Sequence, residues 1–297
     1  MGQFLWRGND AAILPGMADD TTPHGAHTPG AFDAAVIAMT GGLPRNWLGL
    51  RLAIALRRLV TKRLNGDDPG LDVERWGLKL RLHPLKNGCE KGLLFTPQFY
   101  EADEREHLAR QIDRAVMAGR SFVFVDIGAN VGLFSLFVAG RAGGRARILA
   151  IEPERENLRR LRFNLDANPG LPIRVLPHAL GASAGTLALE ANRDDRGGTR
   201  TRPDDGSANA VRVPSKTLLQ ALNEESVTSI DALKIDVEGA EDTILMPFFQ
   251  DAPQSLWPRF LVIEDTSGLW RVDVFAELKA RGYREAGRSR QNVMMER

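Results

Sequence analysis

Residues Phe122-Val-Phe-Val-Asp-Ile-Gly-Ala-Asn-Val-Gly132 decide the fold of this chain. The first four are continuously apolar, as in a parallel strand that is covered on both faces. A turn with small residues at alternate positions follows, and residues 131–138 then open a helix. Such a helix points its free N–H groups at the turn. The segment therefore predicts a nucleotide-binding strand, turn and helix.

The spacing of the small residues indicates which class of nucleotide the turn binds. A dinucleotide fingerprint reads G-x-G-x-x-G, whereas this turn reads Asp126-x-Gly128-x-Asn130-x-Gly132. Asparagine fits the turn because it reaches positive φ more cheaply than most residues. Glu152 ends the next apolar run, 20 residues after Gly132, where an acidic residue commonly meets ribose hydroxyls. The pattern resembles the first motif of S-adenosylmethionine-dependent methyltransferases.

A second strand end carries another acidic turn, in Ile230-Asp-Ala-Leu-Lys-Ile-Asp-Val-Glu-Gly-Ala-Glu241. Together, D-I-G-A-N-V-G, I-E-P and L-K-I-D-V-E-G-A-E are similar to the FkbM-type methyltransferase family, from about Trp76 to the C-terminus. The resemblance implies a Rossmann-like class I methyltransferase of the α/β class. Its sheet would be mostly parallel and seven-stranded, with the last strand antiparallel.

The alternation of strand and helix patterns from residue 122 onward predicts a parallel sheet with helices on both faces. We expect strands near residues 122–126, 147–152, 173–178, 230–236 and 260–264, and helices near 132–140, 154–167, 215–223, 240–249 and 270–281. Upstream, alternating apolar residues predict a strand over 76–82, with which residues 92–96 are expected to pair.

The chain divides into three parts. Residues 1–44 are rich in Gly, Pro, Asp, Thr and His and are expected to be poorly ordered. Residues 45–75 are expected to form a basic amphipathic helix and a linker, and residues 76–297 the FkbM-like domain. A long polar stretch at 192–209 is expected to be disordered, with a lid as the alternative.

The helix predicted at residues 46–64 has two interpretations. Leucines 48, 52, 56 and 59 fall on one side, and Arg51, Arg58 and Lys62 on another. The favoured interpretation packs the leucines onto the main domain, because core-facing stripes explain most amphipathic helices. The alternative is peripheral docking to an anionic membrane surface.

Composition excludes several classes of protein. A net charge of +1 provides no field that recruits nucleic acid. The single cysteine, Cys89, excludes an internal disulfide and a cysteine-rich zinc site. No apolar run reaches the roughly 18 residues that span a bilayer. We expect a soluble, cytoplasmic protein, peripheral to the inner membrane face if the helix at 46–64 docks there.

The resemblance implies S-adenosyl-L-methionine as the cofactor. Ligands of such sheets bind at the carboxyl ends of the strands. The adenosine half is expected across the turn at Gly128, Asn130 and Gly132, with Glu152 accepting from the ribose hydroxyls. Asp126 is expected to face the cofactor's ammonium or, alternatively, to cap the turn.

The third strand ends at His178 and Ala179, which are expected near the adenine. A structural histidine is the alternative for His178.

Lys234, Asp236 and Glu238 alternate with apolar residues, so they share one side of the strand end. Asp236 is the first choice for a general base and Glu238 the second, with Lys234 pairing with them. The alternative is an ion-paired loop that opens the next helix, a role that suits Glu241. Asp236, Glu238 and Glu264 could bind a divalent ion, but no spacing demonstrates one, so no metal is predicted.

These motifs predict a methyltransferase that methylates a hydroxyl of a sugar, a glycan or another small molecule. N-methylation and a nucleotide-binding interaction module without catalysis are the alternatives. A nucleic-acid acceptor is disfavoured, because the chain lacks the Asn/Asp-Pro-Pro-aromatic motif that accompanies a flipped base.

Overall fold

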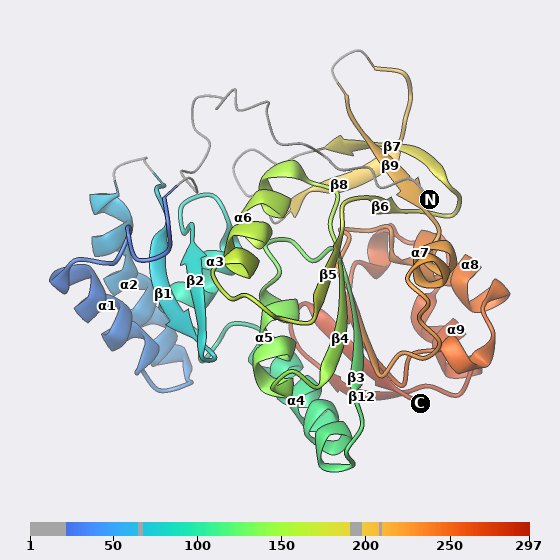
Figure 1. Cartoon of the computed structure of the whole chain (residues 1–297), viewed down its shortest axis with the longest axis horizontal. Coiled ribbons are helices and arrows are strands. Elements are labelled where there is room, and N and C mark those ends of the chain that lie inside the picture. Colours follow the sequence, from blue (N-terminus) through green and yellow to red (C-terminus); the bar gives the residue numbers. More distant parts are fainter. Residues whose placement is uncertain (1–21, 65–67, 191–197, 208–209) are drawn as a thin grey trace.

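The computed structural model describes residues 22–64, 68–190, 198–207 and 210–297, and a mostly parallel sheet forms its centre (Figure 1). The strands of this sheet are β3 (Phe122–Ile127), β4 (Ala146–Ile151), β5 (Ile173–Leu176), β10 (Ala232–Ile235), β11 (Phe260–Glu264), β12 (Arg284–Arg288) and β13 (Asn292–Glu296). Their order is β12-β13-β11-β10-β3-β4-β5, and β13 alone is antiparallel to its neighbours in this seven-stranded sheet. The predicted class I methyltransferase fold is confirmed.

Helices cover both faces of the sheet (Figure 1). They are α4 (Ala102–Met117), α5 (Leu133–Ala142) and α6 (Arg155–Asp166) on one face, and α7 (Leu218–Glu224), α8 (Glu241–Asp251) and α9 (Val274–Ala280) on the other. Successive side chains of β3 point to opposite faces of the sheet. Phe124 packs with α4 and α5, whereas Val125 packs with α7 and α8. This alternation explains why the strand is continuously apolar.

The two motif turns begin side by side. Strands β3 and β10 are parallel neighbours, with Asp126 opposite Lys234 and Ile127 opposite Ile235. From this pair the chain builds β4 and β5 on one side and β11 on the other. Such a switch point opens a crevice at the carboxyl ends of the strands.

The glycines of the first turn permit two close approaches. Gly128 has φ 73°, and a Cβ atom there would lie 1.8 Å from the carbonyl oxygen of Asp236. Gly132 has φ 79°, and its Cβ would lie 2.2 Å from Cδ1 of Leu161 in α6. Asn130 also has positive φ, 54°, as its residue type predicted. The turn thus needs these residues for backbone contact with the β10 turn and for packing of α5 on α6.

An N-terminal lobe packs beside α5 and α6 (Figure 1). It comprises α1 (Ala31–Gly41), α2 (Trp47–Arg63), β1 (Leu71–Arg75), β2 (Leu78–Leu82) and α3 (Gly88–Phe95). Val36, Val60, Leu80 and Leu94 share one hydrophobic cluster with Leu136 of α5. The lobe and the sheet domain are therefore joined by a common core.

Three expectations for this lobe are corrected. Residues 22–44 are not poorly ordered, because α1 buries Val36 and Ile37, while residues 1–21 lie outside the described residues. Residues 92–96 do not pair with β2: they belong largely to α3, which Asn87 caps by accepting from the backbone N–H of Glu90. Strand β2 pairs with β1 instead, so the predicted boundary at residue 76 falls inside a hairpin.

Buried ion pairs hold the lobe together. The guanidinium of Arg81 donates to Asp72 at 2.8 Å and to the carbonyl oxygens of Thr22 and Pro23. Arg160 of α6 bonds to Glu90 of α3, and both side chains are buried. A buried charge is tolerated only with such partners.

A second, four-stranded sheet lies over the carboxyl ends of β4 and β5 (Figure 1). Its strands are β6 (Ala179–Leu180), β7 (Gly185–Glu190), β8 (Arg200–Pro203) and β9 (Val211–Lys216). Strand β8 belongs to the stretch expected to be disordered; residues 191–197 and 208–209 lie outside the described residues. Within the described part of the chain, no helix has the length and apolarity to cross a membrane.

Gly128→Ala is expected to destabilise the protein by about 3 kcal/mol or more, because the new methyl group meets backbone rather than a flexible side chain. Gly143→Ala is the matched control: its φ is 57°, but nothing lies within 4 Å of its Cβ position. The control should lose only about 1–2 kcal/mol, the cost of the left-handed conformation. Urea unfolding measures both, and equal losses would contradict the close approach.

Candidate active site

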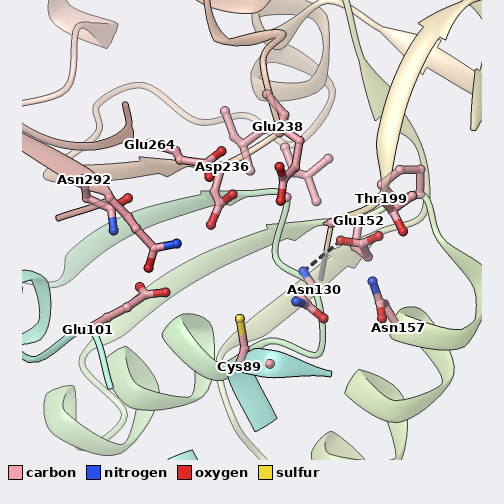
Figure 2. A pocket seen from close by; sticks show the side chains of 18 of the residues that line it. Cys89, Glu101, Asn130, Glu152, Asn157, Thr199, Asp236, Glu238, Glu264 and Asn292 are labelled. Atoms are coloured by element: carbon pink, nitrogen blue, oxygen red, sulfur yellow. Dashed lines mark hydrogen bonds between the residues drawn. The ribbon is translucent and has the colours of Figure 1, made fainter. Parts of the chain in front are cut away.

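A cavity of about 510 Å³ opens at the carboxyl ends of the central strands (Figure 2). Most of the predicted site residues line it, namely Gly128, Asn130, Glu152, His178, Ala179, Asp236 and Glu238. Three others, Asp126, Gly132 and Lys234, are not among its lining residues. The volume is in the range of sites that bind small molecules and cofactors.

Glu152 is a buried carboxyl group on the cavity wall. One oxygen accepts from the backbone N–H of Asn130 at 2.8 Å and the other from that of Glu154 at 2.9 Å. Burial raises its pKa to about 7, although these two hydrogen bonds oppose the shift. The Asn157 side chain also hydrogen bonds to this carboxyl group, which keeps capacity to accept from a hydroxyl donor.

Two asparagines that the sequence did not predict lie beside the first turn and Glu152. Asn87 of the lobe donates to Oδ1 of Asn130 at 2.9 Å, which fixes the first turn from outside the sheet. Asn157 lines the cavity next to Glu152 (Figure 2). Its position in the first turn of α6 follows directly from the I-E-P motif, so spacing could have indicated it.

Asp126 lies beneath the cavity. Its Oδ2 accepts from the backbone N–H of Ser135 at 3.1 Å and from the Ser135 hydroxyl at 2.7 Å, at the start of α5. Burial raises its pKa, and Lys234 opposes the shift. This geometry favours the capping alternative over direct contact with a ligand.

Lys234 is a buried cation behind the catalytic candidates. Its Nζ donates to Oδ2 of Asp236 at 2.7 Å and lies 5.0 Å from the ring centroid of Phe134. Burial alone would lower its pKa, but Asp236, Glu101 and Asp126 outweigh burial and raise it. Lys234 therefore stays charged and compensates acidic groups, which is the pairing role that its sequence position predicted.

The turn after β10 contains one half-buried acid and one fully buried, structural acid. Glu238 has φ 59° and lies 3.8 Å from Arg200 of β8. Glu241 is fully buried and accepts from the backbone N–H groups of Val237 and Gly239 and from the indole of Trp270. Glu241 thus stabilises the turn that precedes α8, whereas the N-cap residue Ala240 has no side-chain cap of the kind that the sequence suggested; Glu238 faces the cavity.

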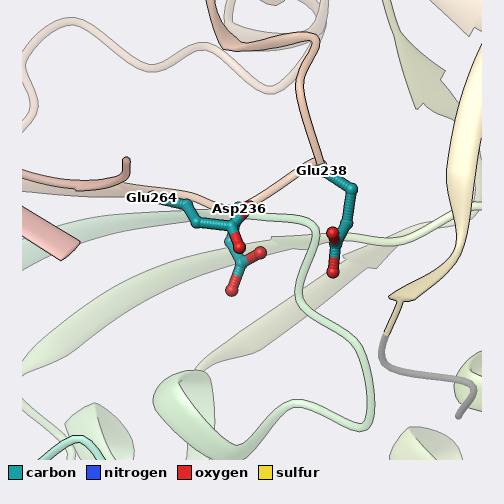
Figure 3. A group of neighbouring side chains, drawn as sticks. All are labelled: Asp236, Glu238 and Glu264. Atoms are coloured by element: carbon teal, nitrogen blue, oxygen red, sulfur yellow. The ribbon is translucent and has the colours of Figure 1, made fainter. Parts of the chain in front are cut away.

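Glu264 ends β11 beside Asp236 and Glu238 (Figure 3). Burial, followed by Asp236 and Glu238, raises its pKa to about 9, so it is protonated at neutral pH. Within the described residues its Oε2 is buried without a hydrogen-bond partner. One oxygen from each of the three acids lies within 4.8 Å of the others, a spacing that also suits a divalent cation.

A further acid, Glu101, enters from the segment before α4 and was not predicted (Figure 2). Burial raises its pKa to about 8, and Lys234 opposes the shift. Asn292 of β13 lines the cavity nearby and donates to Glu104 at 2.9 Å. Oε2 of Glu101 and Oδ1 of Asn292 are both buried without a partner among the described residues.

His178 lies in the cavity wall, as its place after the third strand predicted. Burial lowers its pKa, so the ring is neutral at pH 7. Nδ1 is 3.1 Å from the carbonyl oxygen of Ala179, while Nε2 is buried without a partner in the described part of the chain. Because the carbonyl oxygen can only accept, Nδ1 carries the proton of the neutral ring, and Nε2 is left as an acceptor for an N–H group of a heterocycle.

Comparison with known families gives one match that covers more than half of the chain. The family described as Methyltransferase FkbM domain matches residues 126–285, which include both motif turns.

Two curated proteins are similar to this chain. Methyltransferase sdnD of Sordaria araneosa is 31% identical over 238 residues, covering 63% of this chain and 89% of that protein. AMB antimetabolite synthetase AmbE of Pseudomonas aeruginosa is 32% identical over 159 residues, covering 42% of this chain and 7% of the synthetase.

Solved structures resemble the chain more loosely. The METTL16 MTase domain has a TM-score of 0.46 at 16% identity, covering 90% of this chain and 91% of that one. The SAM Dependent Methyltransferase from Agrobacterium tumefaciens has a TM-score of 0.42 at 11% identity, covering 76% and 69%. At such scores neither structure indicates a site or an acceptor.

The raised pKa of Glu264 predicts a pH effect on stability. A carboxyl whose pKa rises from 4.5 to about 9 on folding stabilises the fold below pH 4.5, and that contribution is lost as the pH rises toward 9. Glu264→Gln cannot ionise, so its melting temperature should fall less between pH 5 and pH 9 than that of the wild type. Glu74→Gln, at an exposed position of β1, is the control. An equal fall in melting temperature between pH 5 and pH 9 in Glu264→Gln and in the wild type would contradict the raised pKa of Glu264.

Proposed function

This chain belongs to the FkbM methyltransferase family, and from that premise we propose that it methylates a hydroxyl of a sugar, a glycan or another small molecule, with S-adenosyl-L-methionine as the methyl donor. One observation carries the proposal: Glu152 and Asp236, the acids at the ends of β4 and β10, line the same cavity. The first suits ribose hydroxyls and the second suits an acceptor hydroxyl.

The residues around Glu152 fit the adenosine part of the cofactor. Backbone N–H groups hold each Glu152 oxygen in place, and the carboxyl group keeps capacity to accept a hydrogen bond from a ribose hydroxyl. His178 offers an unpartnered nitrogen on the same wall, in the part of the chain that the structure describes. When bound, S-adenosyl-L-methionine supplies a methyl group activated by a positively charged sulfur.

Asp236 is the residue that we assign to the acceptor proton. An alkylated hydroxyl must lose its proton, and a carboxylate within hydrogen-bond reach can accept it. The bond from Lys234 to Oδ2 orients this carboxyl and compensates its charge. Glu238, on the same turn, orients the acceptor.

Unsatisfied polar atoms support a hydroxyl-rich substrate. Oε2 of Glu264, Oε2 of Glu101 and Oδ1 of Asn292 belong to cavity-lining residues, and each is buried without a hydrogen-bond partner among the described residues. Buried polar atoms without partners are costly. Sugar hydroxyls both donate and accept, so they would supply partners to several of these atoms at once.

The cofactor assignment is tested by binding. S-adenosylhomocysteine should raise the melting temperature, whereas NAD should not, because the first turn lacks the spacing that cradles a pyrophosphate. A ligand at 100 times its Kd stabilises by about 2.7 kcal/mol.

Glu152→Ala should weaken the binding by about 1.5–3 kcal/mol, the contribution of a hydrogen bond to a charged group. Equal stabilisation by both ligands, or wild-type affinity in the variant, would refute this site.

The catalytic assignment is tested at Asp236. Asp236→Asn keeps the shape of the side chain but not its basicity, so single-turnover rates should fall by about 100- to 10,000-fold while the Kd for S-adenosylhomocysteine changes little. Glu238→Gln should have a milder effect. The acceptor panel should contain sugars and amines, because turnover of amines alone would indicate N-methylation. Activity that survives in Asp236→Asn would exclude its role as base, and loss of wild-type activity on chelation would make the three acids metal ligands.

A further inference from the structure

Helix α2 packs through the side next to the one that its sequence suggests. Its buried residues are Gly49, Ala53 and Val60, whereas Leu48, Leu52 and Leu59 of the leucine stripe are exposed. The favoured interpretation of the sequence, in which the leucine stripe faces the core, is therefore wrong for these three residues, whereas Leu56, the fourth leucine of the stripe, is partly buried against the core of the lobe. Small residues let α2 lie close to the rest of the lobe, and the large apolar side chains face outward.

The exposed leucines are part of a larger apolar patch. We use that term for six exposed residues of α1 and α2: Phe32, Met39, Trp47, Leu48, Leu52 and Leu59. Trp47 is 70% exposed and Leu48 61% exposed. Among the described residues, only four other large hydrophobic side chains are exposed, and they lie outside α1 and α2. A concentration of exposed apolar side chains on two neighbouring helices indicates an interaction site.

Basic side chains flank the patch. Helix α2 contains Arg51, Arg57, Arg58, Lys62 and Arg63 and no acidic residue. With about 3.6 residues per turn, Arg51, Arg58 and Lys62 fall on a strip next to the strip of Leu48, Leu52 and Leu59. Asp33 of α1 pairs with Arg63, and Arg51 lies 5.5 Å from the ring centroid of Trp47. No ion pair is found for Arg58 or Lys62 within the described residues.

We propose that the apolar patch and its basic strip dock this protein onto an anionic lipid surface. A helix that lies in a membrane interface combines exposed Trp and Leu side chains with adjacent Lys and Arg residues. The charge favours anionic headgroups, because each cation near such a surface adds attraction. This combination favours a lipid surface over a second copy of the chain, whose α2 would bring like charges together.

The link between α1 and α2 is also bonded to a segment that lines the cavity. Gln98 donates to the carbonyl oxygens of Thr40 at 2.8 Å and Leu43 at 3.1 Å, at the link between α1 and α2. The residues on both sides of Gln98, including Thr96 and Glu101, line the cavity. Figure 1 shows α1 and α2 at the end of the molecule opposite α7, α8 and α9.

The experiment is flotation of the full chain with vesicles of phosphatidylcholine alone or with added phosphatidylglycerol. We expect binding to the anionic vesicles that weakens with salt. Leu48→Ser/Leu59→Ser should lower the partition coefficient at least tenfold. Arg51→Gln/Arg58→Gln/Lys62→Gln should lower it by about 100-fold, since each cation contributes roughly fivefold. Both variants should keep the wild-type melting temperature, because the changed side chains are exposed.

Met117→Ser/Val211→Ser is the matched control, because both residues are exposed and lie outside the patch. It should float like the wild type. Binding that is equal in the wild type and the patch variants, or equal on neutral and anionic vesicles, would overturn the proposal. So would a failure to bind vesicles together with dimerisation, measured by sedimentation, that Leu48→Ser/Leu59→Ser abolishes. None of these results depends on methyl transfer, so they are read separately from the catalytic test.

Discussion

The close contact between the turn after β3 and the turn after β10 is the constraint on which the site depends. Gly128 lies against the carbonyl oxygen of Asp236, while its own N–H and that of Ala129 donate to Ile151 at the end of β4. The first turn is thus held between two strand ends. Because a side chain at residue 128 would push the turns apart, this one glycine keeps Glu152 and Asp236 on a common cavity.

A single buried lysine sets the electrostatics of that cavity. Lys234 pairs with Asp236 and attracts Asp126 and Glu101. Lys234 cannot compensate the charge of every acid around the cavity. Burying further carboxylates would cost free energy, and this cost is avoided when Glu101 and Glu264 hold protons. Glu101 and Glu264 therefore have pKa values of about 8 and about 9. At neutral pH the acceptor side of the cavity is rich in neutral carboxyl groups, which can both donate and accept hydrogen bonds.

The N-terminal lobe completes the site rather than merely preceding it. Asn87 fixes Asn130, and the segment from Thr96 to Glu101 supplies a cavity wall. The lobe is attached to the sheet domain by the buried pair of Arg160 with Glu90 and by a shared hydrophobic core. The surface that we assign to lipid docking is therefore rigidly connected to the wall of the cavity.

Although it did not indicate the second sheet of β6 to β9, the sequence by itself determined the alternation of β3, β4, β5, β10 and β11 with their helices, the positive φ of Asn130 and the convergence of Glu152 and Asp236. These features follow from continuous apolar runs, small residues at turns and the rule that parallel strands end at one edge. An Asn-x-x-Glu signal at residues 87–90 could also have indicated α3, because an asparagine three residues before a glutamate is typical of a helix start.

Only the tertiary structure decided which way individual side chains face. Asp126 turns beneath the cavity to Ser135, Glu101 arrives from a segment outside the motifs, and α2 buries Gly49 and Ala53 instead of its leucines. The physical reason is the same in each case. A local pattern specifies the element and its two sides, whereas the side that becomes buried depends on the shape and charge of neighbours that are distant in the sequence.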